Sequence, residues 1–165
     1  MVLDSYKYTW YINTSFVRRS SPVQIGTNSN WIYFYSGGDS GHKMALNSNK
    51  EMHFWSNNIS GAWGNNNDDS SAAAYITSGF TLPGPWISAT TGHDQSMGIK
   101  DDGTLWARGE NNQGSLGLNQ PVNTKLSSPT QVGTNTNWQC IKAGGTEPLS
   151  TTMAIKTDGT LWMWG

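Results

Sequence analysis

The residues that could carry chemistry are few, and their spacing does not assemble a reactive centre. His42, His53 and His93 lack the short spacing that presents two imidazoles to one metal ion. Cys140 is the only cysteine, and its apolar neighbours predict a buried, inert thiol. The sequence therefore predicts no metal site and no disulfide framework.

Two adjacent acidic pairs, Asp68–Asp69 and Asp101–Asp102, invite a general acid–base interpretation. Asp102 precedes Gly103 in a predicted turn, and neighbouring strand residues point to opposite faces, so the second pair is not expected to converge. The chain also lacks a Gly-x-Ser-x-Gly nucleophile motif, a Walker loop and a dinucleotide-binding glycine turn. We predict no catalytic residues, no cofactor and no enzymatic activity.

An asparagine-rich segment is the best sequence candidate for a binding loop. It resembles the start of a calcium loop, but Ser70 stands where glycine is needed and Ile76 where glutamate is needed. We predict a polar surface loop, with weak ion binding as the alternative. Trp63 either stacks on a sugar or protein partner or fills the position of Leu116 in the repeat described below. The candidate binding residues are Trp63, Asn65, Asn66, Asn67, Asp68 and Asp69.

Composition excludes several classes of partner. The chain has 165 residues, a net charge of −1 and only 13% charged residues, so we expect no nucleic-acid binding. No apolar run is long enough to span a membrane, and the first residues do not resemble a secretory signal. Nine tryptophans in a chain rich in Asn, Ser, Thr and Gly favour a folded, loop-rich β protein.

Internal repeats predict how the strands are organised. The segment 21–31 (SPVQIGTNSNW) returns as 128–138 (SPTQVGTNTNW), and 97–106 aligns without a gap on 153–162. Segment 44–53 is a weaker third copy in the same frame. The period of about 54 residues, holding about four short strands, is that of a propeller blade.

Each copy contains a predicted hairpin. Asp102–Gly103 and Asp158–Gly159 join two apolar runs, a strong hairpin signal, whereas Asn49–Lys50 departs from it and relies on the tolerance of Asn for positive φ. The Ser-Pro-x-Gln segment suits an edge strand. The recurring positions, predicted to be structural, are Trp31, Trp86, Trp106, Trp138, Trp162, Gly103 and Gly159.

Arg108 stands where the other copies carry Trp55 and Trp164. A charge at an otherwise aromatic position implies either an exposed site or a guanidinium stacked on a ring. We therefore include Arg108 among the candidate binding residues, as a mark of a contact surface.

These motifs resemble the repeat of the RCC1 (regulator of chromosome condensation) family of β-propellers, and segment 109–117 resembles that family's linker between units. The resemblance covers residues 21–165 and implies blades of about four antiparallel strands in a ring of about seven. The first unit departs from it: His53 replaces a tryptophan, 61–64 replaces Gly-x-Leu-Gly, and 70–86 lacks Ser-Pro-x-Gln.

The repeats divide the chain into a lead-in strand from a neighbouring blade (1–20), repeat 1 (21–76), repeat 2 (77–127) and an incomplete repeat 3 (128–165). Three blades leave open sheet edges, so we expect further blades of a longer chain, or other subunits, to complete the ring. The longer chain is favoured.

A propeller without a catalytic motif is expected to be a binding or structural module. The repeats are similar to those of bacterial surface and bacteriophage proteins, which implies a virion component (tail, fibre or capsid-attached) or a cell-surface protein that contacts a host glycan, a receptor or other subunits. The alternatives are an RCC1-type regulator, acting in small-GTPase nucleotide exchange and chromatin contact, and a tryptophan-based lectin.

Overall fold

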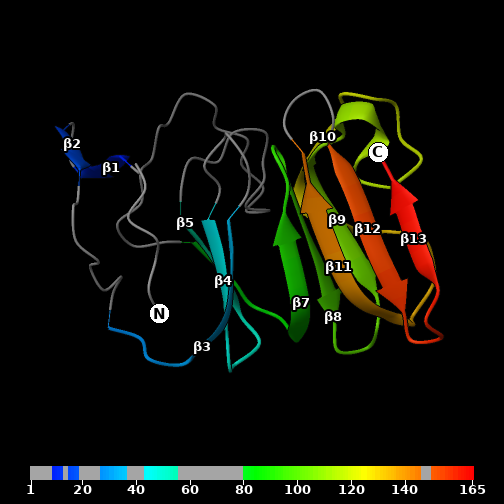
Figure 1. The fold of residues 1–165 in the computed structure, drawn as a ribbon, viewed down its shortest axis with the longest axis horizontal. Helices are drawn as coiled ribbons and strands as arrows, with labels where there is room; N and C mark the ends of the chain where they lie inside the picture. Colours follow the sequence, from blue (N-terminus) through cyan, green and yellow to red (C-terminus); the bar gives the residue numbers. More distant parts are fainter. Residues whose placement is uncertain (1–8, 13–14, 19–26, 37–42, 56–79, 146–149) are drawn as a thin grey trace.

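The computed structural model describes residues 9–12, 15–18, 27–36, 43–55, 80–145 and 150–165. Three antiparallel sheets follow one another along the chain, and a two-stranded hairpin lies near the N-terminus (Figure 1). The predicted all-β class and the blade-like unit are confirmed.

Each sheet is a simple up-and-down meander. Sheet 1 consists of β3 (Trp31–Ser36), β4 (Lys43–Asn47), β5 (Met52–Trp55) and β6 (Phe80–Leu82). Sheet 2 consists of β7 (Trp86–Thr91), β8 (Gln95–Lys100), β9 (Leu105–Glu110) and β10 (Lys125–Gln131), and sheet 3 of β11 (Trp138–Gly144), β12 (Thr151–Lys156) and β13 (Leu161–Trp164). A short 3-10 turn covers Asn112–Gly114.

Among the described strands, β1 (Thr9–Ile12) and β2 (Ser15–Arg18) pair only with each other. The interpretation of residues 1–20 as a strand of a neighbouring blade stays a prediction.

The sequence repeat and the sheet are offset by one strand. The Ser-Pro-x-Gln motif at 128–131 lies in β10, the edge strand that closes sheet 2, although it opens the third repeat. Pro129 lies where the register between β10 and β9 shifts, a position that needs no ladder donor. Boundaries at 21–76, 77–127 and 128–165 thus describe the sequence repeat, whereas each sheet begins at its first tryptophan.

The hairpin turns explain the glycines of the motif. Gly103 and Gly159 have φ of 77° and 83°, the left-handed region that glycine enters without cost. In the first copy Lys50 occupies this position, with φ 62°. The residue that replaces glycine is therefore Lys50 and not Asn49, because Lys50 is the one in frame with Gly103.

Successive sheets pack face to face. We call the face of a sheet that packs on the preceding sheet its leading face, and the opposite one its trailing face. The trailing face of sheet 2 forms one core with the leading face of sheet 3, and sheet 1 packs on sheet 2 in the same way. The trailing residues are Met44, Leu46, Met52 and Phe54 in sheet 1 and Met97, Ile99, Leu105 and Ala107 in sheet 2, all at most 2% exposed.

Backbone contacts fix the spacing of the sheets. The first tryptophan of a sheet donates its N–H to the turn of the preceding hairpin: Trp86 to the Lys50 carbonyl and Trp138 to the Gly103 carbonyl, both at 3.1 Å. At the other end, Thr152 Oγ1 and Trp164 Nε1 donate to the Ser115 carbonyl at 3.0 and 2.9 Å. The segment 109–117, expected to be a linker, thus joins sheets 2 and 3.

Candidate functional site

The hairpin ends of sheets 2 and 3 share one arrangement on the leading face. In sheet 2, the Lys100 ammonium lies 4.0 Å from the centroid of Trp106 and 5.3 Å from that of Trp86. In sheet 3, Lys156 lies 4.0 Å from Trp162 and 4.8 Å from Trp138. Each sheet therefore holds its own cation between two indole rings, a favourable cation–π geometry.

A short chain of hydrogen bonds supports the second ring. Asp102 Oδ1 accepts from Thr104 N at 3.0 Å and from Thr104 Oγ1 at 2.6 Å, and Thr104 Oγ1 accepts from Trp106 Nε1 at 2.8 Å. Asp158, Thr160 and Trp162 repeat the same contacts at 2.9, 2.6 and 3.0 Å. Because threonine bonds hold the pKa of each of these carboxyl groups below its usual value, both aspartates are ionised at neutral pH.

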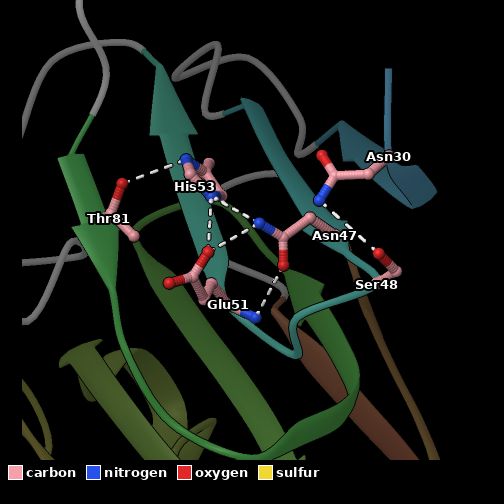
Figure 2. Close-up of polar contacts among 6 residues, drawn as sticks. All are labelled: Asn30, Asn47, Ser48, Glu51, His53 and Thr81. Carbon is pink, nitrogen blue, oxygen red and sulfur yellow. Dashed lines mark hydrogen bonds and ion pairs between the residues drawn. The ribbon is translucent and has the colours of Figure 1, made fainter. Parts of the chain in front are cut away.

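Sheet 1 replaces this arrangement with a polar network. At the positions of lysine, threonine and tryptophan it carries Asn47, Glu51 and His53 (Figure 2). Asn47 Oδ1 accepts from Glu51 N at 3.0 Å, and Asn47 Nδ2 lies 2.7 Å from Glu51 Oε2 and 3.1 Å from His53 Nε2. On its other side, His53 Nδ1 contacts Thr81 Oγ1 of β6 at 3.0 Å. Trp31 meets the imidazole edge-on, with centroids 4.8 Å apart.

These contacts assign the imidazole tautomer. Because the Asn47 carbonyl oxygen faces a backbone donor, its amide nitrogen must face His53, and Nε2 must offer a lone pair to that donor. The ring proton is then on Nδ1 and is donated to Thr81 Oγ1. An imidazole in this form cannot take a proton from Thr81, so the Glu–His–Thr arrangement does not supply a general base.

Burial and hydrogen bonding set the charges of the network. The Asn47 amide, with a smaller contribution from His53, lowers the pKa of Glu51, so its carboxylate is ionised. Burial lowers the pKa of His53, and nearby Glu51 opposes this only in part, so the imidazole is neutral at pH 7. The network therefore carries the charge of Glu51 alone, whereas sheets 2 and 3 each combine the charge of a lysine with that of the turn aspartate, Asp102 or Asp158.

Two metal-ligating side chains meet here, Glu51 Oε2 and His53 Nε2, 3.7 Å apart. Within the described ranges no three His, Cys, Asp or Glu side chains gather in a way that could hold an ion. The sequence-based expectation of no metal and no cofactor stays a prediction.

The sequence-predicted site residues fall into two groups. Trp63, Asn65, Asn66, Asn67, Asp68 and Asp69 lie outside the described residues, so the binding role of that loop stays a prediction. Arg108 is buried, and its guanidinium lies 4.3 Å from the ring centroid of Phe54 in sheet 1. Burial lowers the pKa of Arg108 to about 9, which keeps the group cationic at pH 7. Of the two geometries expected for Arg108, stacking on a ring is the one observed.

The recurring tryptophans do not share one environment. Trp86 and Trp138 are buried in the two cores, Trp106 packs against the first of them, and Trp162 is 47% exposed. Cys140, expected to be buried, is exposed on β11, because it follows the register shift at the start of that strand.

Sequence reasoning missed Asn47, Glu51 and Thr81. The gapless alignment of 44–53 on 97–106 did carry a signal for two of them, since it places Asn47 on Lys100 and Glu51 on Thr104. Thr81 had no such signal, because only the pairing of β5 with β6 brings it to His53.

No family model and no curated protein matches the sequence of the chain. Solved structures do match its fold. Yeast RCC1 (Prp20), in a crystal structure bound to Kap60, aligns with a TM-score of 0.71 and 21% identity over 94% of this chain. Prp20p from Saccharomyces cerevisiae, described with its binding to Gsp1p and histones, gives 0.72 and 17%, and human WBSCR16 gives 0.68 and 16%, each over 94% of this chain.

The fold is that of RCC1-like β-propellers. The chain spans only 36% to 38% of the length of these three structures. The fold expected from the sequence resemblance is confirmed, whereas the bacteriophage and bacterial-surface type finds no support among these structures.

One expectation is overturned by the comparison. A location on a virion or cell surface conflicts with the structural neighbours, since Prp20p is described as binding histones, which are proteins of the cell interior. The prediction of that location is wrong. Glycan or host-receptor partners also find no support, whereas protein partners do. No helix among the described residues has the length and apolar character needed to cross a membrane.

Proposed function

We propose that this chain is a non-enzymatic, protein-binding part of an RCC1-type regulator whose partner is a small GTPase. One observation carries the proposal: the three sheets align with yeast RCC1 over 94% of the chain, and that protein is described as binding Gsp1p. We prefer this function to the virion component, for which no neighbour provides support.

The geometry agrees with binding rather than catalysis. The sheets are held in fixed spacing by backbone bonds from Trp86 and Trp138 to the preceding turns, so the hairpin ends form a rigid rim. Rigid scaffolds that display loops are common binding surfaces. The polar network around His53 offers a neutral imidazole whose proton faces Thr81, which is unsuited to activating a hydroxyl.

The test is binding of the full chain to purified Gsp1p, in nucleotide-free and nucleotide-loaded forms, by biolayer interferometry. We expect binding that depends on the nucleotide state and no turnover of small ester or glycoside substrates. A histone dimer serves as the comparison, because Prp20p is described as binding histones as well. Absence of binding to either form of Gsp1p at micromolar concentration would contradict the proposal.

A further inference from the structure

We propose that Tyr35 and Lys142 tie sheet 1 directly to sheet 3, past the edge of sheet 2 that β7 forms. In repeat proteins each unit usually contacts only its neighbours, so a direct tie between the first and third sheets departs from the common pattern. The inference goes beyond the proposed function and does not depend on it, because it concerns only contacts within the chain.

The first strands of the three sheets lie side by side. β3, β7 and β11 are each an edge strand of their own sheet, and β7 contacts both of the others. Each of these strands carries one residue that pairs with the methionine opening the repeated hairpin segment. These in-frame residues are Tyr35, Thr90 and Lys142.

Lys142 of sheet 3 reaches the ring of Tyr35 in sheet 1. Its ammonium lies 4.7 Å from the ring centroid, within the range of a cation–π contact. Burial raises the pKa of Tyr35, and Tyr33 and Cys140 add to the rise. Cys140 is two positions from Lys142 and shares its face of β11, so two side chains of sheet 3 lie near Tyr35.

Tyr35 is also held against sheet 2, which lies between the other two. Its ring packs on the core that sheets 1 and 2 share, and its hydroxyl oxygen is within hydrogen-bonding reach of the Ala89 backbone and the Ser88 side chain. By comparison, the shorter Thr90 meets the adjacent sheet, where its Oγ1 accepts the N–H of Ala143 at 2.9 Å. The larger side chain of Tyr35 therefore meets both of the following sheets at one point.

The tie restrains how sheets 1 and 3 can move relative to each other. The cores between successive sheets hold each pair of neighbours, whereas the contact of Lys142 with Tyr35 joins two sheets that share no core. A change at Tyr35 should therefore alter the contribution of Lys142 to stability, although the two residues belong to sheets that are not neighbours.

The test is a double-mutant cycle on the full chain, with the unfolding equilibrium constant measured in urea. Lys142→Met should raise this constant about twofold to fivefold, the range of an exposed cation–π contact. In a Tyr35→Leu background the same change should have no further effect, because the ring is gone. In a Tyr35→Phe background the full effect should persist, because the ring face remains. Lys125→Met, at another exposed lysine, is the matched control and should have the same effect in every background.

A second readout detects the contact itself by nuclear magnetic resonance. The ε-methylene protons of Lys142 should resonate upfield of those of Lys125, since an aromatic ring shields protons that lie over its face, and Tyr35→Leu should abolish the difference. Additive effects of Lys142→Met and Tyr35→Leu, or equal resonances of the two lysines in the unaltered chain, would each overturn the proposal. If Tyr35→Leu does not fold, the resonances of the unaltered chain still decide.

Discussion

Sheets 2 and 3 carry almost the same hairpin, but their trailing faces have opposite environments. Met97, Ile99 and Leu105 of sheet 2 are 2%, 0% and 0% exposed, whereas Met153 and Leu161, two of their counterparts in sheet 3, are 41% and 61% exposed. In the part of the chain that the structure describes, sheet 3 packs on the first of these faces and no sheet packs on the second. The same residues therefore stabilise the fold only where a neighbouring sheet removes them from water.

The largest expected effect comes from truncating one leucine in each hairpin. Leu105→Ala should lower the free energy of unfolding by about 2–5 kcal/mol, because it leaves a cavity between sheets 2 and 3. Leu161→Ala should cost less than about 1 kcal/mol, since its side chain is already largely in water. Urea unfolding followed by tryptophan fluorescence measures both. Equal losses would mean that something covers the trailing face of sheet 3 in solution.

The second largest difference between sheets 2 and 3 is expected from alanine substitutions of their turn glycines. Alanine at either position should lower the free energy of unfolding by about 1 kcal/mol, because its side chain disfavours the left-handed backbone. A Cβ at Gly103 would also collide with the Thr136 carbonyl, which belongs to the segment leading into sheet 3, whereas nothing lies near a Cβ at Gly159. Gly103→Ala should therefore destabilise by at least about 1 kcal/mol more than Gly159→Ala in thermal unfolding. Equal unfolding temperatures of the two variants would contradict this prediction.

A smaller difference is expected from the threonines that support the second ring. Thr104→Val removes the acceptor of the Trp106 indole and should cost about 1–3 kcal/mol, because Thr104 is buried and water cannot replace it fully. Thr160→Val should cost less than about 1 kcal/mol, since the 47% exposed Trp162 can donate to water. Chemical denaturation of both variants measures the difference, and a larger loss for Thr160→Val would contradict it.

The smallest expected effect is a pH dependence of the unfolding free energy that comes from His53 of sheet 1. Burial lowers the pKa of His53 below its ordinary value of 6.5, so the unfolded chain binds this proton first as the solution is acidified. The stability that comes from the neutral imidazole is present above pH 6.5 and is lost as the pH falls through the folded-state pKa. His53→Gln should flatten the decline of the unfolding free energy just below pH 6.5. A decline of the same slope in that variant would assign it to another group.

The fold was predictable because its signals are local and repeated. Asp102–Gly103 and Asp158–Gly159 marked hairpins, and the apolar runs that each turn joins marked the strands. The candidate site was harder to predict from the sequence. Glu51 and Asn47 were visible as departures from the repeat, but their meaning depends on which side chains they meet, and Thr81 joins them from 28 residues away.

The environment of Arg108 also depended on a residue that is far away in the sequence. Its place at an aromatic position was plain in the alignment, but two geometries, exposed or stacked, were equally consistent with the sequence. The choice was made by Phe54, which belongs to the preceding sheet. The environment of a residue at an interface between two sheets can be predicted only when the side chains of both sheets are known.

The sequence alone determined the strands, the turns and the repeat, because these depend on backbone preferences and on the alternation of apolar residues within about ten positions. The tertiary structure alone decided which of two nearly identical faces is buried and which tautomer His53 adopts. Those properties depend on contacts between segments far apart in the chain, and on how much water each contact removes.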